Sequence, residues 1–146
     1  MTYRAFFDAN VLAYGFDKSA PEKREIAQEL IREWLPSRKM VISTQVLQEL
    51  FIVLTRGLKP SLPTEKARKV IEDFSKIEVH LVEPEIILRA IDVSQKHKIS
   101  FWDALIVSAA SKARCRVLFT EDLNHGQKIE GVKIVNPFQI RETAAI

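Results

Sequence analysis

A few acidic residues in this sequence stand where a carboxylate could do chemistry rather than simply face water. Each of them directly follows a short apolar run or lies near the start of a segment with helical spacing of apolar residues. These residues are Asp8, Glu49, Asp103, Glu121 and Asp122. Carboxylates gathered in one place repel one another and raise their own pKa values, and a divalent cation removes that conflict. Because all the ligands would be oxygen atoms, such a cluster favours Mg²⁺ or Mn²⁺ over zinc.

Each acid taken alone also has a purely structural explanation. Asp8 could cap a short helix, and Glu49 could be a solvated helix residue. Ser100 and Asp103 fit a capping-box pattern, with a serine at the cap and an acid three residues later. Glu121 and Asp122 are adjacent in the sequence and could form a polar turn. The metal-site interpretation therefore depends on the whole set lying together.

An alternation of predicted strands and helices would bring these acids together. The expected strands are Tyr3–Phe7, Met40–Ser43, Glu78–Val82, Arg116–Thr120 and Val132–Val135. The expected helices are Pro21–Trp34, Thr44–Thr55, Thr64–Lys76, Pro84–Lys96 and Ser100–Ala113. This order predicts a three-layer α/β/α sandwich with a central, mainly parallel five-stranded sheet. In such sheets ligands bind beyond the carboxyl ends of the strands, which is where Asp8 and Asp122 would stand.

The predicted helix Ser100–Ala113 is apolar almost all round. A helix with that pattern is buried, so we expect Trp102 in the core and Asp103 entering the interior near the helix N-terminus. A buried carboxylate needs a partner, a proton or a metal. The pattern of this helix therefore strengthens the metal-site interpretation.

Length and composition indicate one globular domain over residues 1–146. The single cysteine cannot form an internal disulfide, which favours a reducing compartment. No apolar stretch approaches the eighteen or more residues that a membrane span needs, so we expect a soluble cytoplasmic protein. Clusters of basic residues are expected to be solvated faces, and some could rim the acidic cleft and hold phosphates. They are Arg56–Lys59, Lys66–Lys69, Lys96–Lys98 and Lys112–Arg116.

The ordered set of motifs resembles the PIN domain, a family of metal-dependent ribonucleases, and most of all the VapC-type toxins of toxin–antitoxin pairs. The resemblance covers nearly the whole chain. Its matching segments are Phe7–Leu12, Gln48–Leu50, Phe101–Ile106, Leu118–Gly126 and Gly131–Phe138.

The resemblance implies an acidic catalytic and metal site made of Asp8, Glu49, Asp103 and Asp122. Asp8 and Asp103 would be the principal metal ligands. Glu49 would complete the cluster directly or through water, and Asp122 would hold a ligand, a metal-bound water or a second ion. Whether Asp122 or its neighbour Glu121 faces the metal stays open.

The same resemblance suggests supporting roles for polar neighbours that could orient water or an acidic side chain. These are Asn10, Thr120 and either Ser43 or Thr44. It also implies one or two Mg²⁺ or Mn²⁺ ions, an RNA substrate hydrolysed by a metal-bound water, a homodimer and a cognate antitoxin that blocks the site.

Three other functions compete with a VapBC-type toxin ribonuclease. A stand-alone RNA-processing PIN nuclease would carry the same acids, and a non-catalytic PIN-like module would bind RNA or protein without cleaving. A phosphatase of the haloacid-dehalogenase type also begins with an acid after its first strand, but it needs a second acid where this chain has Asn10.

The net charge of +3 conceals an uneven distribution under this interpretation. With four of the 19 acids in one site, the other 15 face 22 Lys and Arg residues, a formal charge of +7. A basic surround of that kind suits a protein that binds a polyanion.

Overall fold

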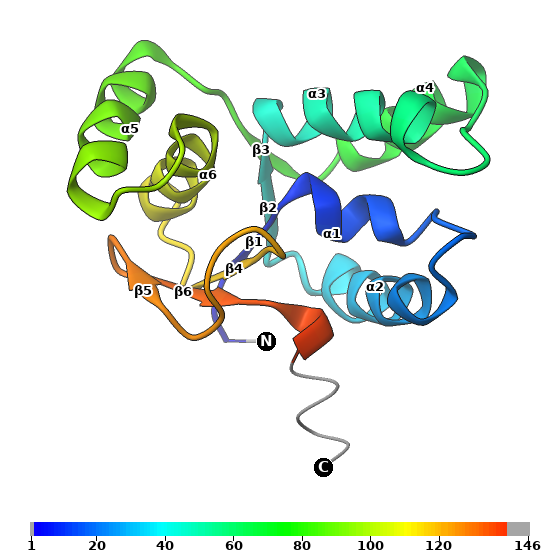
Figure 1. Cartoon of the computed structure of the whole chain (residues 1–146), viewed down its shortest axis with the longest axis horizontal. Coiled ribbons are helices and arrows are strands. Elements are labelled where there is room, and N and C mark those ends of the chain that lie inside the picture. Colours follow the sequence, from blue (N-terminus) through cyan, green and yellow to red (C-terminus); the bar gives the residue numbers. More distant parts are fainter. Residues whose placement is uncertain (1, 140–146) are drawn as a thin grey trace.

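The apolar runs of the sequence form the strands of one sheet in the computed structural model, which describes residues 2–139. The sheet has six strands in the order β3-β2-β1-β4-β6-β5 (Figure 1). All neighbouring strands are parallel except the pair β5 and β6. The strands are β1 (Ala5–Phe7), β2 (Met40–Ser43), β3 (Glu78–His80), β4 (Val117–Phe119), β5 (Lys128–Ile129) and β6 (Val132–Val135).

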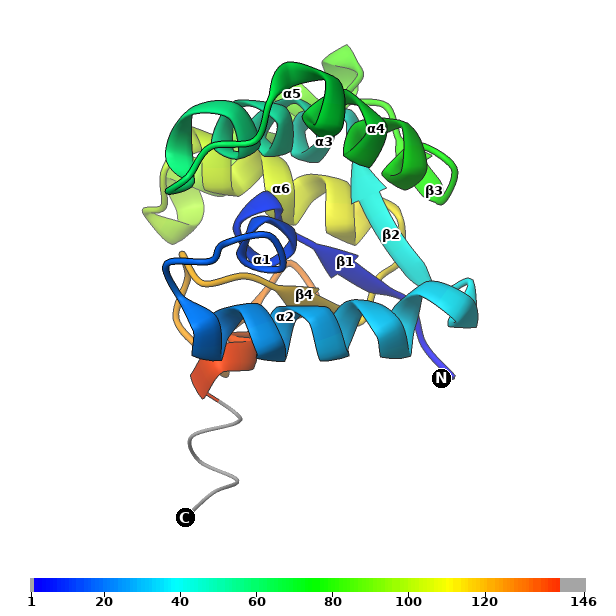
Figure 2. The same cartoon turned by 90° about the vertical axis from the view of Figure 1, so that its right-hand side faces the viewer.

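The strands at the centre of the sheet are buried on both faces, as their unbroken apolar sequences predict. Phe6 of β1 lies opposite Val41 of β2 on one side and Leu118 of β4 on the other. Figure 2 shows β1 and β2 running side by side in the same direction. Because β1 and β4 are parallel neighbours, the residues that follow them emerge at the same edge of the sheet.

Helices cover both faces of the sheet, which confirms the predicted three-layer arrangement. Figure 1 shows α5 and α6 on one side and α1 to α4 on the other. The helices are α1 (Ala9–Tyr14), α2 (Pro21–Trp34), α3 (Thr44–Ile52), α4 (Thr64–Phe74), α5 (Pro84–His97) and α6 (Phe101–Lys112). A π-helical turn, η2 (Val53–Gly57), follows α3, so this helix ends before the predicted Thr55.

The sixth strand was missing from the sequence prediction of five. β5 is only two residues long, too short for any apolar periodicity to mark it. It pairs with β6 through a tight turn at Glu130 and Gly131, whose φ angles are 50° and 82°. Two successive positive φ angles are typical of a two-residue hairpin turn.

The helix α6 is buried along most of its length, but its first turn is not. Residues Ala104 to Ala110 are all buried, whereas Trp102 is 66 % exposed. The prediction of Trp102 in the core is therefore wrong. Phe101, its neighbour in the first turn, packs against the core instead, so the two adjacent aromatic side chains differ in burial.

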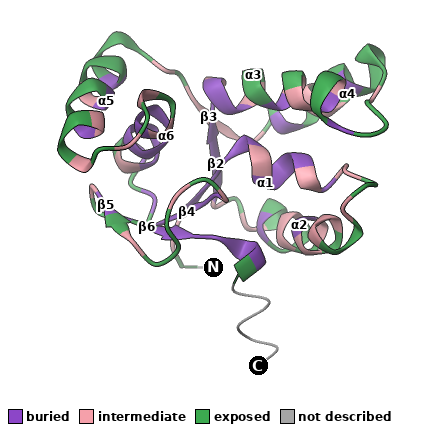
Figure 3. Cartoon of the chain, viewed as in Figure 1, coloured by how far each residue is buried: buried purple, intermediate pink, exposed green. Residues whose placement is uncertain are grey.

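Aromatic rings fill the core beneath α2. The ring of Trp34 contacts those of Tyr3, Phe7 and Phe119, with centroids 5.6, 6.0 and 5.8 Å away. Figure 3 shows the buried strands at the centre of the molecule and exposed residues on the outer helix faces. Phe7 and Phe119 are the last residues of β1 and β4, so this cluster fixes the positions of both strand ends.

The helices within residues 2–139 were also compared with what a membrane span requires. None of them combines the length and the apolar character needed to cross a bilayer.

The two tryptophans of the chain allow a matched test of this core. Because Trp34 is 2 % exposed, Trp34→Ala leaves a large cavity and should lower the free energy of unfolding by about 3–5 kcal/mol. Trp102→Ala should change it by less than about 0.5 kcal/mol, since that ring is mostly in water. Urea unfolding of the two variants measures both values, and equal losses would contradict this description of the core.

Candidate active site

The ends of β1 and β4 place a carboxylate and a hydroxyl in direct contact. The backbone N–H of Asp8 donates to the carbonyl of Phe119 at 3.0 Å, which continues the ladder between the two strands. Asp8 then caps α1, and Thr120 follows β4 beside it. The parallel pairing of β1 and β4 therefore creates the centre of the site.

Asp8 is almost fully buried and each of its carboxylate oxygens has a hydrogen-bond donor. Oδ1 accepts from the N–H of Ala9 at 2.7 Å, and Oδ2 accepts from the hydroxyl of Thr120 at 2.8 Å. Burial nevertheless raises the pKa of Asp8 to about 7, against the two hydrogen bonds, and the charges of Glu49 and Asp122 add to the rise. This carboxylate is thus in a place that disfavours its charged form.

Thr120 links Asp8 to the next acid in the turn. Its hydroxyl donates to Asp8 and accepts from the backbone N–H of Asp122 at 3.2 Å. Thr120 is 1 % exposed, so its orientation is set by these two partners. Thr120, one of the expected supporting residues, is therefore in contact with both Asp8 and Asp122.

The structure separates the roles of the adjacent acids Glu121 and Asp122. Glu121 accepts from the ammonium of Lys23 at 2.5 Å and from the phenol of Tyr14 at 2.8 Å. Asp122 lines the same cavity as Asp8 and Glu49. Burial raises the pKa of Asp122 first of all, and the charges of Asp103 and Glu121 raise it further. Asp122, not Glu121, is the member of the pair that faces the other acids.

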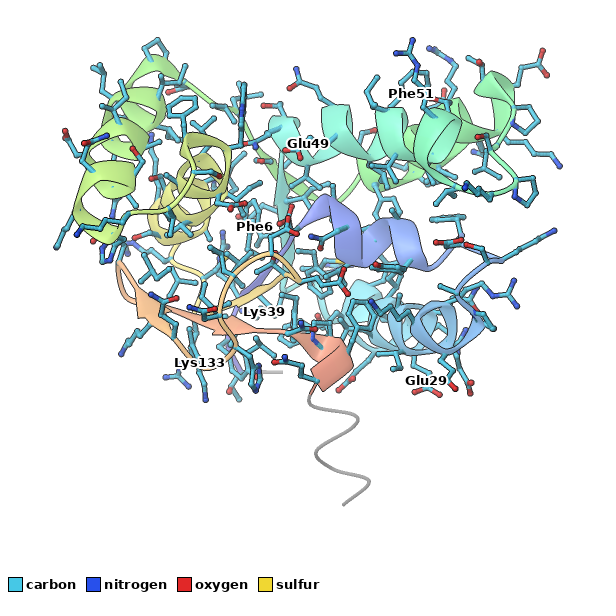
Figure 4. All side chains as sticks on the ribbon, viewed as in Figure 1. Phe6, Glu29, Lys39, Glu49, Phe51 and Lys133 are labelled. Carbon is cyan, nitrogen blue, oxygen red and sulfur yellow. The ribbon has the colours of Figure 1, made fainter. Side chains whose placement is uncertain are left out.

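Glu49 comes from the middle of α3, and Asp103 comes from the first turn of α6, on the other side of the sheet. Figure 4 shows Glu49 on the part of α3 nearest to α6. The amide of Gln45 donates to Glu49 at 2.6 Å and to the carbonyl of Trp102 at 3.2 Å, so it joins the two helices. Burial and the charges of Asp122 and Asp103 raise the pKa of Glu49.

Asp103 is partly buried, so it enters the interior less fully than the apolar pattern of its helix predicts. Its backbone N–H donates to the hydroxyl of Ser100 at 3.1 Å, so Ser100 caps α6 as the capping pattern predicts. Its charge raises the pKa values of both Glu49 and Asp122. Asp103 therefore belongs to the acidic group electrostatically while standing at its rim.

A cavity of about 310 Å³ lies between these residues. Asn10, the second residue of α1, lines it and donates a side-chain hydrogen bond to Asp122. The carbonyl oxygen Oδ1 of Asn10 is buried and has no partner. An unpartnered acceptor beside clustered carboxylates is a place where a bound water or cation would be stabilised.

The hydroxyls of Ser43 and Thr44 have structural partners. Ser43 caps α3 by accepting from the N–H of Val46 at 3.5 Å, and Thr44 accepts from the N–H of Val82 at 3.2 Å. His125 likewise accepts a backbone hydrogen bond, from Asn136 at 3.0 Å. Each of these three side chains therefore has a structural role as the acceptor of a backbone hydrogen bond.

Three residues around the site were not found from the sequence. Gln45 stands four residues before Glu49, the spacing that puts two side chains on one helix face, and this signal could have revealed it. Tyr14 and Lys23 reach Glu121 across more than ninety residues of chain. No local pattern marks such a contact.

The donor set of the site consists of oxygen atoms, which suits a hard divalent cation. As the side chains stand, no three His, Cys, Asp or Glu residues within 2–139 form a ready-made metal-binding group. The charges of Glu49 and Asp122 raise the pKa of Asp8, and the charge of Asp103 raises the pKa values of Glu49 and Asp122.

Comparisons with known proteins were made at the level of sequence family and of fold. A family profile described as the PIN domain matches residues 5–128. A search of curated proteins finds no match.

Several solved structures share this fold over nearly the whole chain. A toxin–antitoxin complex from Klebsiella pneumoniae has 22% identity and a TM-score of 0.67, with 91% of this chain and 97% of that chain covered. The DNA-bound VapBC from Salmonella typhimurium has 21% identity and a TM-score of 0.66, covering 93% and 99%. VapC20 from Mycobacterium tuberculosis, a sarcin-ricin loop cleaving toxin, has 17% identity and a TM-score of 0.61, covering 81% and 89%.

The raised pKa of Asp8 predicts how stability depends on pH when no metal is present. Between its ordinary value of 3.8 and about 7, the folded chain holds a proton on Asp8 that the unfolded chain has lost. Stability should therefore fall as pH rises through this window. Asp8→Asn keeps this side chain neutral at every pH. The free energy of unfolding of the variant should therefore exceed that of the parent chain by an amount that grows from pH 5 to pH 8 and reaches on the order of 2–4 kcal/mol.

Thermal unfolding in a chelating buffer at several pH values measures this difference. Asp92→Asn, an exposed acid on α5, is the control and should follow the parent chain at every pH. A variant Asp8→Asn that is less stable than the parent at pH 8 would rule out the proposed cost of the Asp8 charge.

Proposed function

Because the chain belongs to the PIN domain family, we propose that it is a metal-dependent endoribonuclease that hydrolyses RNA phosphodiester bonds. The observation that carries the proposal is the set of four acids, Asp8, Glu49, Asp103 and Asp122, that act on one another at the carboxyl edge of the sheet. A protein that only binds RNA gains nothing from clustered negative charge. We further propose that residues 1–146 form one nuclease domain and that it works in the cytoplasm.

We assign the four acids as the ligands of Mg²⁺ or Mn²⁺, with Asp8 and Asp103 as the principal ones. The unpartnered Oδ1 of Asn10 and the all-oxygen donor set support this assignment. When bound, the ion would activate water and stabilise charge on the phosphoryl oxygens. It would also favour the ionised form of Asp8, which the fold alone disfavours.

The neighbours of the acids would hold them in place for the reaction. Ala9 and Thr120 fix both oxygens of Asp8, Asn10 orients Asp122, and Gln45 orients Glu49. Lys23 and Tyr14 engage Glu121, which keeps a fifth negative charge out of the cavity. A phosphodiester entering the cleft would therefore not meet the charge of Glu121 without its counter-ion.

Replacing either principal ligand should abolish cleavage without unfolding the chain. Asp8→Asn and Asp103→Asn each keep the size of the side chain but remove the charge that would hold the cation. Cleavage of a labelled RNA in Mg²⁺ should fall by at least about 100-fold, the scale expected when a metal site is lost. Undiminished cleavage by either variant would refute the assignment of that ligand.

Two controls make this experiment specific. Glu33→Gln, an exposed acid on α2, should cleave like the parent chain. Mn²⁺ should raise the unfolding temperature of the parent and of Glu33→Gln, and should do so much less for Asp8→Asn. This second readout tests metal binding even if the RNA chosen is a poor substrate.

We propose that the ribonuclease acts as the toxin of a VapBC-type pair and that a cognate antitoxin binds it. The fold relatives support this, since they include a toxin–antitoxin complex and VapBC proteins. An apolar groove of about 550 Å³ between α3 and α4 supports it too, because Ile52 in its wall is 48% exposed. Glu49 lies on the same helix as this wall, so a segment bound there could cover the acidic cleft.

We also propose a homodimer that forms through the outer face of α5. Large apolar side chains are exposed on this helix and on the segment before it, which a lone subunit leaves in water. They are Leu81, Ile87, Leu88 and Ile91, with exposures of 62%, 38%, 65% and 46%.

A charge placed on this face should separate the subunits. Sedimentation of the parent chain at micromolar concentration should give a dimer, and Leu88→Glu should give a monomer because the carboxylate would be buried at the interface. Ile52→Glu places the same charge in the α3–α4 groove and should leave the dimer intact. A monomeric parent chain, or a dimer that Leu88→Glu does not weaken, would contradict this interface.

A further inference from the structure

A second large cavity, of about 720 Å³, lies apart from the acidic site and is lined by basic residues. It sits where α6 ends, where β4 begins and against the β5–β6 hairpin. Its cationic side chains are exposed, and within residues 2–139 they form no ion pair with an acid. They are Arg114, Arg116, Lys128 and Lys133.

The one carboxylate in the wall of this cavity is already engaged elsewhere. Glu130 accepts from His97 at 3.0 Å and from Lys96 at 3.5 Å, and Arg89 is 3.9 Å away. All three partners come from α5. Glu130 is thus unable to neutralise the four cations of the cavity, so the positive charge there has no counterpart among the described residues.

Two of the cations are held side by side by the backbone. Lys128 of β5 lies directly opposite Lys133 of β6 in the antiparallel register. Like charges in directly opposed positions destabilise a strand pair. The turn at Glu130 and Gly131 fixes this register, so the chain cannot relieve the repulsion by shifting the strands.

The basic cavity and the acidic site lie at opposite ends of α6. Asp103 is in the first turn of this helix and Arg114 comes just after its last turn. Eleven residues of helix separate them by about 16 Å. Figure 4 shows the labelled Lys133 at the far side of the sheet region from Glu49. The cluster Lys112–Arg116 therefore does not rim the acidic cleft, which was one of the two expectations from the sequence.

We propose that this basic cavity binds the phosphates of a single-stranded RNA as a second contact outside the acidic cleft. The cations are spread over a helix end and two strands rather than converging on one point, which fits successive phosphates of a chain better than one small anion. Arg116 lies over the ring of Tyr3, with 5.4 Å between guanidinium and ring centroid, and this contact positions its charge at the cavity wall.

The choice of RNA over other polyanions rests on the proposed ribonuclease function, but the binding itself can be measured without cleavage. In a chelating buffer the acidic site repels RNA and leaves it intact. The affinity that remains for an RNA of about 20 nucleotides then reports the basic cavity. The test variant is Lys128→Gln with Lys133→Gln in the otherwise unchanged chain.

The double variant should bind this RNA about tenfold more weakly at about 0.1 M salt. The slope of log affinity against log salt should fall by about 1.4, which is the loss of two phosphate contacts to a single strand. The control, Arg32→Gln with Lys66→Gln, removes two exposed positive charges from other faces and should change the affinity less than about twofold.

Stability gives a second readout that does not depend on RNA. Because Lys128 and Lys133 repel each other, the double variant should unfold at a temperature equal to or higher than that of the parent chain. This result also shows that a loss of RNA binding is not a loss of folding.

Three results would overturn the proposal. They are unchanged RNA affinity in the double variant, an equal loss in the control variant, and displacement of the RNA by about 1 mM inorganic phosphate, which would indicate a small-anion site. The assignment to RNA would be overturned if the double variant bound single-stranded DNA more weakly than the parent chain does but bound the RNA equally well. If RNA binding depends on the two lysines but no RNA is ever cleaved, the basic cavity stands and the ribonuclease function fails.

Discussion

The carboxylate of Asp8 is buried at the junction of the parallel strands β1 and β4, and this burial governs the chemistry of the site. Asp8 continues the ladder between β1 and β4 through its backbone, and its side chain is held by Ala9 and Thr120. Both oxygens are hydrogen-bonded, yet burial still raises the pKa of the group to about 7. Hydrogen bonds alone therefore do not compensate for removing the charge from water.

The charges of the neighbouring acids make the ionised form of Asp8 still less favourable. Glu49, Asp103 and Asp122 come from α3, α6 and the turn after β4, and their charges act on one another across the cavity. A fold selected only for stability would place lysines or arginines here. The chain instead uses Lys23 to neutralise Glu121, the one acid beside the cluster that faces away from it. This distribution is what a protein needs if a cation completes the site.

The parts of this site that follow from local patterns could be predicted, and the parts that depend on distant contacts could not. Asp8 and Asp122 follow buried strands, so their position at the sheet edge was predictable from alternation and burial. Glu121 and Asp122 could not be told apart, because Tyr14 and Lys23, which engage Glu121, are more than ninety residues away in sequence. The expectation for Trp102 was wrong because an apolar sequence does not reveal which residue of a first helical turn its neighbours leave uncovered. The two-residue strand β5 lacks any periodicity, although the basic cavity is built on it.

The central claim is that Asp8, Glu49, Asp103 and Asp122 form one site for a divalent cation. A crystal structure of the chain grown with Mn²⁺, with anomalous diffraction to locate the metal, tests this directly. We expect manganese in the cavity beside Asn10, with oxygens of Asp8 and at least one other of these acids at about 2.1 Å. A structure that shows no manganese at the four acids, with each of them in the place described above, would contradict this assignment.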